Sequence, residues 1–240
     1  VAAWLVLLSA MDMGTAKANE DFARANSLQT SLAFVLSGDA QIDQTSELGL
    51  KGLNRILRER TAAELGPPQA VNPGVDDLSF FPLLYWPIVP GYRLPNDLTA
   101  QRVIQYLRSG GTVLFDTRDR SGGAGLPALR ELAVNLDLPP LVPVPRDHVL
   151  TRSFYLLDDM PGRWTGDGVW IEKAGERVND GVASVISGSH DWAAAWAEDE
   201  TQRPLYPVVP GGERQREIAY RFGVNLVMYT LTGNYKADQV

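Results

Sequence analysis

A run of charged residues directly after an apolar strand is the first place in this sequence where chemistry could occur. The stretch "GGTVLFDTRDR" (110–120) leads from strand-forming residues into Asp116, Arg118, Asp119 and Arg120. A carboxylate at the end of a strand can bind a divalent metal, act as a general base or hold a ligand hydroxyl group. The same aspartates can instead pair with the neighbouring arginines and end the strand. The sequence leaves both interpretations open.

The two histidines of the chain are further candidates, and each has an aspartate beside it. His148 follows Asp147 in "RDHVLTRSFY", where Asp147 is also a good cap for a short helix. The other histidine precedes Asp191 in "SGSHDW", a stretch that lacks the GxSxG pattern of a nucleophile elbow. We expect Ser189 or Asp191 to cap a helix there. His148 and Asp191 are kept as candidate ligand-binding residues.

Aromatic residues precede the charged run by about 30 positions in the chain. Tyr85 and Trp86 end the stretch "FFPLLYWP", and their flat faces could stack on a sugar or an aromatic ligand. Packing in the core is the alternative role for each. The metal-binding patterns HExxH and the EF-hand loop are absent. Asp116, Asp119 and Asp191 could therefore share a metal only if folding brought them together.

Apolar strands alternate with amphipathic helices along the chain. This order predicts an α/β fold, a three-layer sandwich with a mostly parallel central sheet and helices on both faces. In such folds ligands bind outside the carboxyl ends of the strands. We predict strands at 31–39, 83–86, 112–115 and 181–187, and short β segments at 153–159 and 168–173. We predict helices at 43–60 (capped by Asp43 or Thr45), between Asn96 and Gly110, at 126–136, after 191 and at 214–231.

Composition excludes several classes of protein. The chain has 240 residues and a net charge of -7, with no cluster of Lys and Arg, so we expect no binding to nucleic acid. It has no cysteine, which excludes disulfides, a cysteine nucleophile and thiolate metal sites. Metal motifs are absent as well, and we predict no cofactor.

The first eleven residues are apolar and uncharged. We expect residues 1–30 to be the end of a membrane or signal segment followed by a polar linker, and residues 31–240 to form one α/β domain. A spanning helix needs about 20 apolar residues, so this reading requires the segment to begin before residue 1. A buried terminal helix or strand is the alternative.

Four long stretches together resemble a bacterial domain family of unknown function. They are "FFPLLYWP", "SGGTVLFDTRD", "DHVLTRSFYLLDDMPGR" and the C-terminal segment from "RPLYPVVPGGERQREIAYRF" onward. Members commonly form the C-terminal domain of large membrane proteins that begin with an aerotolerance-type double-transmembrane segment. The resemblance implies a flavodoxin-like fold similar to class I glutamine amidotransferases. Those enzymes need a cysteine nucleophile, which this chain lacks, so glutamine hydrolysis by that route is excluded.

These observations favour a non-catalytic binding module on a membrane-tethered protein, with its globular domain in the periplasm. Its partner would be a small molecule or a membrane protein. The alternative is a hydrolase that uses Asp116 with a divalent metal or as a general base, and a purely structural role is a third reading. The candidate ligand-binding residues are Tyr85, Trp86, Asp116, Arg118, Asp119, His148 and Asp191.

Overall fold

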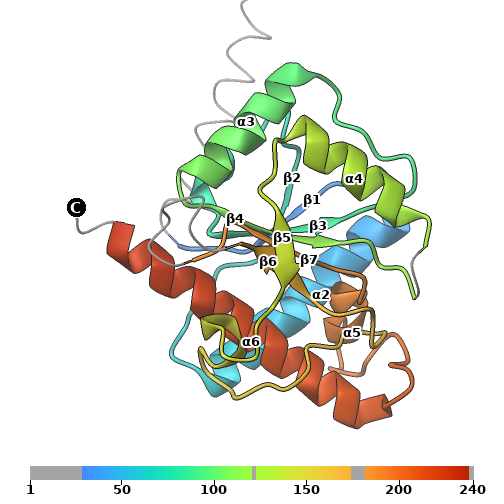
Figure 1. Cartoon of the computed structure of the whole chain (residues 1–240). Coiled ribbons are helices and arrows are strands. Elements are labelled where there is room, and N and C mark those ends of the chain that lie inside the picture. The colour runs from blue at the N-terminus through green and yellow to red at the C-terminus, as the bar shows by residue number, and fades with distance from the viewer. Residues whose placement is uncertain (1–28, 121–122, 174–181, 238–240) are drawn as a thin grey trace, which may run out of the picture.

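A seven-stranded sheet forms the middle layer of the structure, a computed structural model that describes residues 29–120, 123–173 and 182–237 (Figure 1). Five neighbouring strands run parallel, and the last two are antiparallel to their neighbours. The strand order is β2-β1-β3-β4-β7-β6-β5. The strands are β1 (Ala33–Val35), β2 (Gln69–Val71), β3 (Leu83–Pro87), β4 (Thr112–Asp116), β5 (Leu141–Pro143), β6 (Trp170–Glu172) and β7 (Val185–Gly188).

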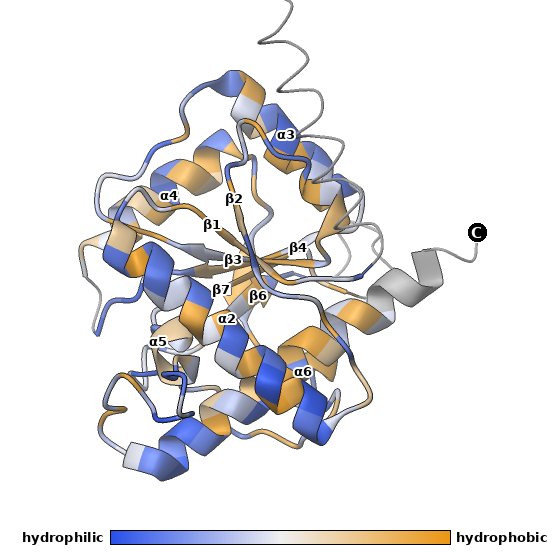
Figure 2. Cartoon of the chain, turned by 180° about the vertical axis from the view of Figure 1, so that it is seen from behind, coloured by the Kyte–Doolittle hydropathy of each residue, from blue (hydrophilic) through white to orange (hydrophobic). Residues whose placement is uncertain are grey.

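Helices cover both faces of this sheet, as the sequence predicts. One layer contains α2, α5 and α6, and the other contains α3 and α4 (Figure 1). The strands are mostly hydrophobic, whereas α2 carries hydrophilic residues on the side away from the sheet (Figure 2). The helices are α2 (Ala40–Arg60), α3 (Asp97–Arg108), α4 (Gly125–Asn135), α5 (Trp192–Trp196) and α6 (Gly212–Ala237), with short 3-10 turns η1 (Leu78–Phe80) and η2 (Val149–Thr151).

The five parallel strands have the order expected of a flavodoxin-like sheet. In chain order among themselves they are arranged 2-1-3-4-5, which is the doubly wound flavodoxin order. The predicted α/β sandwich with a mostly parallel sheet is confirmed. The likeness to glutamine amidotransferases stays a prediction.

Successive side chains along each strand point to opposite faces of the sheet, so they pack into two different hydrophobic cores. Tyr85 and Leu114 pack on the side of α2, α5 and α6, whereas Trp86 and Phe115 pack on the side of α3 and α4. The parallel register places Pro87 beside Asp116 and Asp116 beside Gly188. The ends of three strands therefore share one edge of the sheet, which we call the carboxyl edge.

The helix starts were only partly predicted. Asn96 caps α3 as expected, because its side chain accepts the backbone N–H of Thr99. The predicted cap of the first long helix was wrong. Asp39 caps α2 by accepting the N–H groups of Gln41 and Ile42, and Asp43 lies inside the helix.

The region between α4 and β7 departs most from the prediction. Residues 153–159 form no strand, because Asn225 of α6 holds them by accepting the N–H of Tyr155 and donating to its carbonyl oxygen. The proline-rich crossing instead contains the edge strand β5. Pro143 is tolerated there because an edge strand needs only one set of ladder hydrogen bonds.

The apolar residues 1–11 lie outside the described residues, as does most of the predicted linker. Among the helices of the described ranges, none is long and apolar enough to cross a membrane.

Candidate functional site

Asp116 ends β4 and is completely buried at the carboxyl edge. Its Oδ1 accepts the backbone N–H groups of Arg118 (2.9 Å), His190 (3.1 Å) and Asp191 (3.1 Å). Its Oδ2 accepts the N–H of Trp192 at 2.8 Å and the hydroxyl of Tyr85 at 3.0 Å. These five donors fill the roughly four lone-pair directions of a carboxylate. Asp116 thus has no free direction for a metal or for a reacting proton.

The same environment perturbs the ionisation of this carboxyl group. Burial and the nearby Asp191 carboxylate raise the pKa of Asp116, while the N–H groups of Trp192 and Arg118 oppose that rise. Burial and the Asp116 carboxylate also raise the pKa of Tyr85, so its phenol remains a donor. A perturbed carboxyl group can indicate catalysis, but structural networks perturb pKa values as well. The saturated contacts of Asp116 favour a structural role.

Asp191 is the second buried carboxylate, and it lies between two arginines. Its Oδ1 accepts Nε of Arg118 at 3.0 Å, and its Oδ2 accepts a terminal nitrogen of Arg163 at 3.3 Å. Arg118 and Asp191 both have left-handed backbone, with φ of 58° and 52°. An ion pair therefore does lie at this strand end, but it joins Arg118 to Asp191. Among the described residues the predicted pairing of Asp116 and Asp119 with Arg118 and Arg120 is not found, so that part of the prediction was wrong. We call Tyr85, Asp116, Arg118, Arg163 and Asp191 the Asp116 cluster.

Three predicted site residues lie outside this cluster. Asp119 accepts the N–H of Gly125 at 2.9 Å at the start of α4. Trp86 is fully buried in the opposite core against Phe115, because neighbouring strand residues point to opposite faces. His148 caps η2 by accepting the N–H of Leu150 at 3.1 Å. His148 also takes the capping role predicted for Asp147, so that prediction was wrong.

Residues 160–169 connect the Asp116 cluster to a cavity. The backbone N–H of Trp164 donates to the carbonyl oxygen of His190 at 3.0 Å, and the backbone N–H of Arg163 donates to the carbonyl oxygen of Asp191 at 3.4 Å. The guanidinium of Arg163 lies over the ring of Trp164, 4.5 Å from its centre. The Asp116 cluster therefore fixes both the 160–169 segment and the backbone of residues 190–192.

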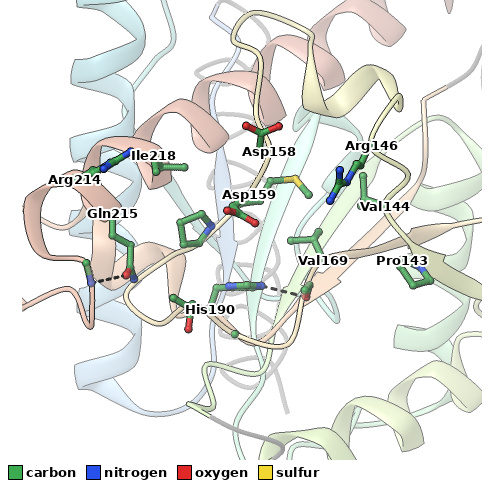
Figure 3. Close-up of a pocket in the computed structure, with 16 residues that line it drawn as sticks. Pro143, Val144, Arg146, Asp158, Asp159, Val169, His190, Arg214, Gln215 and Ile218 are labelled. Atoms are coloured by element: carbon green, nitrogen blue, oxygen red, sulfur yellow. Dashed lines mark hydrogen bonds between the residues drawn. The ribbon is translucent and has the colours of Figure 1, made fainter.

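The cavity has a volume of about 590 Å³ and lies beside this segment at the carboxyl edge (Figure 3). Its walls come from residues within 143–146, 158–169 and 211–218, together with His190. We call it the rim cavity. Topology favours ligand binding where the strand order reverses, here between β1 and β3. The rim cavity lies instead near β5, β6 and β7.

His190 forms a rigid wall of the rim cavity. Its ring stacks on Trp192 with centres 4.5 Å apart, and its two nitrogens face the carbonyl oxygens of Gly168 (3.1 Å) and Trp164 (3.4 Å). A Cβ at Gly166 would lie 2.4 Å from this ring, so only glycine fits there. With 1 % of its surface exposed, His190 has no free nitrogen for proton transfer.

Gln215 fixes the opposite wall at the start of α6. Its amide nitrogen donates to the carbonyl oxygens of Gly162 (2.9 Å) and Val209 (3.1 Å), and its Oε1 accepts the N–H of Gly211 at 3.0 Å. Four charged side chains at the cavity have no such partners among the described residues. They are Arg146, Asp158, Asp159 and Arg214.

Within the described ranges, no group of three His, Asp or Glu side chains is placed to hold a metal ion. Residues 31–231 match the family described as "Domain of unknown function (DUF4159)". The chain belongs to this family. A search of curated proteins found no match. The DUF4159 assignment confirms the resemblance to a domain family of unknown function, while the association with an aerotolerance-type membrane segment stays a prediction.

Sequence reasoning missed the residues of the rim cavity in this DUF4159 domain. They come from β5, α6 and the irregular segment between them, and no shared periodicity or motif marks them. Two of the stretches quoted for the family resemblance do contain them. "DHVLTRSFYLLDDMPGR" includes Asp158 and Asp159, and "RPLYPVVPGGERQREIAYRF" includes Arg214 and Gln215.

Proposed function

We propose that this chain is a non-catalytic module that binds a small molecule in the rim cavity. The observation that carries the proposal is the cavity itself, whose volume of about 590 Å³ is within the range of small-ligand sites. Apolar side chains such as Val169 and Ile218 line it beside a few polar groups. Gln215 and His190 are both held by hydrogen bonds, so the walls are formed before a ligand arrives.

The contacts of the buried polar groups argue for binding over catalysis. Asp116 is saturated by donors, which weakens the alternative of a hydrolase that uses it as a base or a metal ligand. The ring nitrogens of His190 both face carbonyl oxygens. A general base must reach the substrate proton. The oxygens of Asp116 are occupied by donors, and the ring nitrogens of His190 are buried and directed at backbone carbonyl groups.

We further propose that the module is tethered to a membrane through residues before the described part, with the domain in the periplasm. Thr30 accepts the N–H of Gly66 just before β1, so the chain enters the sheet at the edge opposite the carboxyl edge. A tether on that side would leave the rim cavity facing away from the membrane.

The test is a thermal-shift screen of the chain with amino acids, short peptides, sugars, nucleotides and divalent metals. A ligand at 100 times its dissociation constant stabilises a protein by about 2.7 kcal/mol. Ile218→Trp should fill the cavity and abolish the shift. Ile104→Trp, at a half-buried position on α3, should keep it. The proposal fails if no compound shifts the chain, or if I218W and I104W respond alike.

A further inference from the structure

The rim cavity carries four charged side chains that have no partner in the described part of the chain, and their signs balance. Arg146 and Arg214 supply two positive charges, and Asp158 and Asp159 supply two negative ones. All four side chains are exposed, and none makes an ion pair or a side-chain hydrogen bond within the described residues. Elsewhere on the chain, Arg55 pairs with Glu198 and Arg60 pairs with Glu217. Charges that converge on a cavity without partners are free to bind a ligand.

The two positive side chains lie on opposite sides of the cavity. Arg214 lies on the first turn of α6, and Arg146 follows β5 on the other side of the cavity (Figure 3). Asp159 lies between them in this view, on the 158–169 segment. A ligand with a single charge would meet repulsion from one pair as well as attraction from the other. A ligand that carries both charges can satisfy both.

The rest of the lining argues against other common ligand classes. A nucleotide base or a sugar ring commonly stacks on an exposed aromatic face. His190 is the one aromatic ring in the described lining, and it is covered by Trp192 and is 1 % exposed. A phosphate group would face Asp158 and Asp159, and the described part of the chain places no third ligand beside these two carboxylates for a metal ion.

We propose that the rim cavity binds a zwitterion of the amino-acid or short-peptide type. A guanidinium of Arg146 or Arg214 takes the carboxylate in a bidentate contact, and Asp158 and Asp159 take the ammonium group. The apolar body of the ligand packs on Met160, Val169 and Ile218. This inference rests on the proposed function, because it names the ligand class of the same cavity.

The experiment measures affinity by calorimetry for one scaffold in four charge states. Leucine is the zwitterion, leucine amide the cation, N-acetyl-leucine the anion and N-acetyl-leucine amide the neutral form, with Leu-Leu as the peptide. We expect leucine or Leu-Leu to bind, and blocking either charge to weaken binding by about tenfold or more, as loss of a charge-assisted hydrogen bond should.

Variants assign each charge to its side chain. The double variant Asp158→Asn, Asp159→Asn should remove the preference of the cavity for a free ammonium group. The double variant Arg146→Ala, Arg214→Ala should remove its preference for a free carboxylate. Asp167→Asn and Arg152→Ala are matched controls, because both residues are exposed and lie outside the cavity lining. Both controls should keep the affinity of the unaltered chain.

The outcomes separate this inference from the proposed function. If a sugar, a nucleotide or a singly charged compound binds in a manner that I218W abolishes while zwitterions do not bind, the ligand class is wrong and the binding module stands. If no compound of either panel binds, the proposed function falls together with the ligand class.

Discussion

The Asp116 cluster and the rim cavity lie side by side at one edge of the sheet and use charge in opposite ways. In the cluster, Asp116 and Asp191 are buried and bonded to backbone N–H groups, a tyrosine and two arginines. In the cavity, Asp158 and Arg214 are exposed and have no partners within the described residues. A charged group that already has partners leaves no atom for a ligand, whereas a charged group without a partner at a cavity is available to one.

The Asp116 cluster and the rim cavity are also connected by direct contacts. Asp116 binds the N–H of His190, and the ring of His190 forms a wall of the cavity. The segment that carries Asp158 and Asp159 continues into Arg163, which pairs with Asp191. The cluster therefore acts as the support that holds the cavity in shape.

The largest expected effect comes from Asp116→Asn. The amide would place an NH₂ donor among groups that all donate, so several buried N–H groups would lose their acceptor. We expect the free energy of unfolding to fall by about 3–5 kcal/mol, the usual cost of breaking a buried charged network. Urea denaturation followed by circular dichroism measures it.

The matched control for D116N is Asp119→Asn, three residues further along. Asp119 is partly exposed and accepts the single N–H of Gly125, and asparagine keeps an acceptor oxygen there, so D119N should cost less than about 1 kcal/mol. If D116N and D119N cost the same, the cluster is not the support that we infer.

Gly166→Ala should have the next largest effect, because it disturbs the link between the two regions. Gly166 has φ of 64°, and a Cβ there would lie 2.4 Å from the His190 ring. Left-handed strain plus the clash should cost roughly 3 kcal/mol of unfolding free energy. Gly212→Ala is the control, with φ of 56° and open space, and should cost about 1 kcal/mol. Equal losses for the two variants in urea denaturation would mean that the ring of His190 yields to the added methyl group.

A smaller effect concerns the pH dependence of stability through His148. Burial lowers the pKa of His148 below the ordinary value of 6.5, and the nearby Asp147 carboxylate partly opposes this. As pH falls, His148 therefore takes up a proton at a higher pH in the unfolded chain than in the folded one. The contribution of His148 to stability is fully present above about pH 6.5 and is lost as pH falls towards the lowered pKa. A loss of stability on protonation agrees with the hydrogen bond at this position, because only an unprotonated Nδ1 can accept the N–H of Leu150.

His148→Asn measures that contribution, because asparagine can cap η2 and does not titrate in this range. Unfolding free energies between about pH 8 and about pH 5 should decline less steeply for H148N than for the unaltered chain. Parallel pH profiles would show that the cap does not depend on a neutral imidazole.

The smallest effect on stability should come from the cavity itself. Arg146→Ala and Arg214→Ala remove exposed side chains that have no partner among the residues described, and each should change the unfolding free energy by less than about 0.5 kcal/mol. Arg216→Ala is the contrast two residues away, since Arg216 is buried and donates to the carbonyl oxygens of Ala195 and Tyr206. It should cost about 2 kcal/mol or more. A large loss for R214A would show that its charge already has a structural partner.

Much of the fold could be predicted from local sequence patterns. The stripe of Leu50, Leu53 and Leu57 predicts α2, and Asn96 and Gly110 correctly bracket α3. These signals are local, because a cap or an apolar stripe depends on residues within a few positions. The edge strand β5 and the turns at 153–159 were not predicted, because their partners Ile171 and Asn225 lie far away in the chain.

The same distinction between local signals and contacts across the chain applies to the candidate site. The sequence by itself determined that charges gather where β4 ends, that this end lies on the carboxyl edge of a parallel sheet, and that a cysteine nucleophile is excluded. Only the tertiary structure decided that Asp116 is saturated, because four of its five donors come from residues 31 or more positions away. It also decided that the cavity forms from three separate segments together with His190. Contacts between distant segments depend on how helices and strands pack, and no short stretch of sequence records that packing.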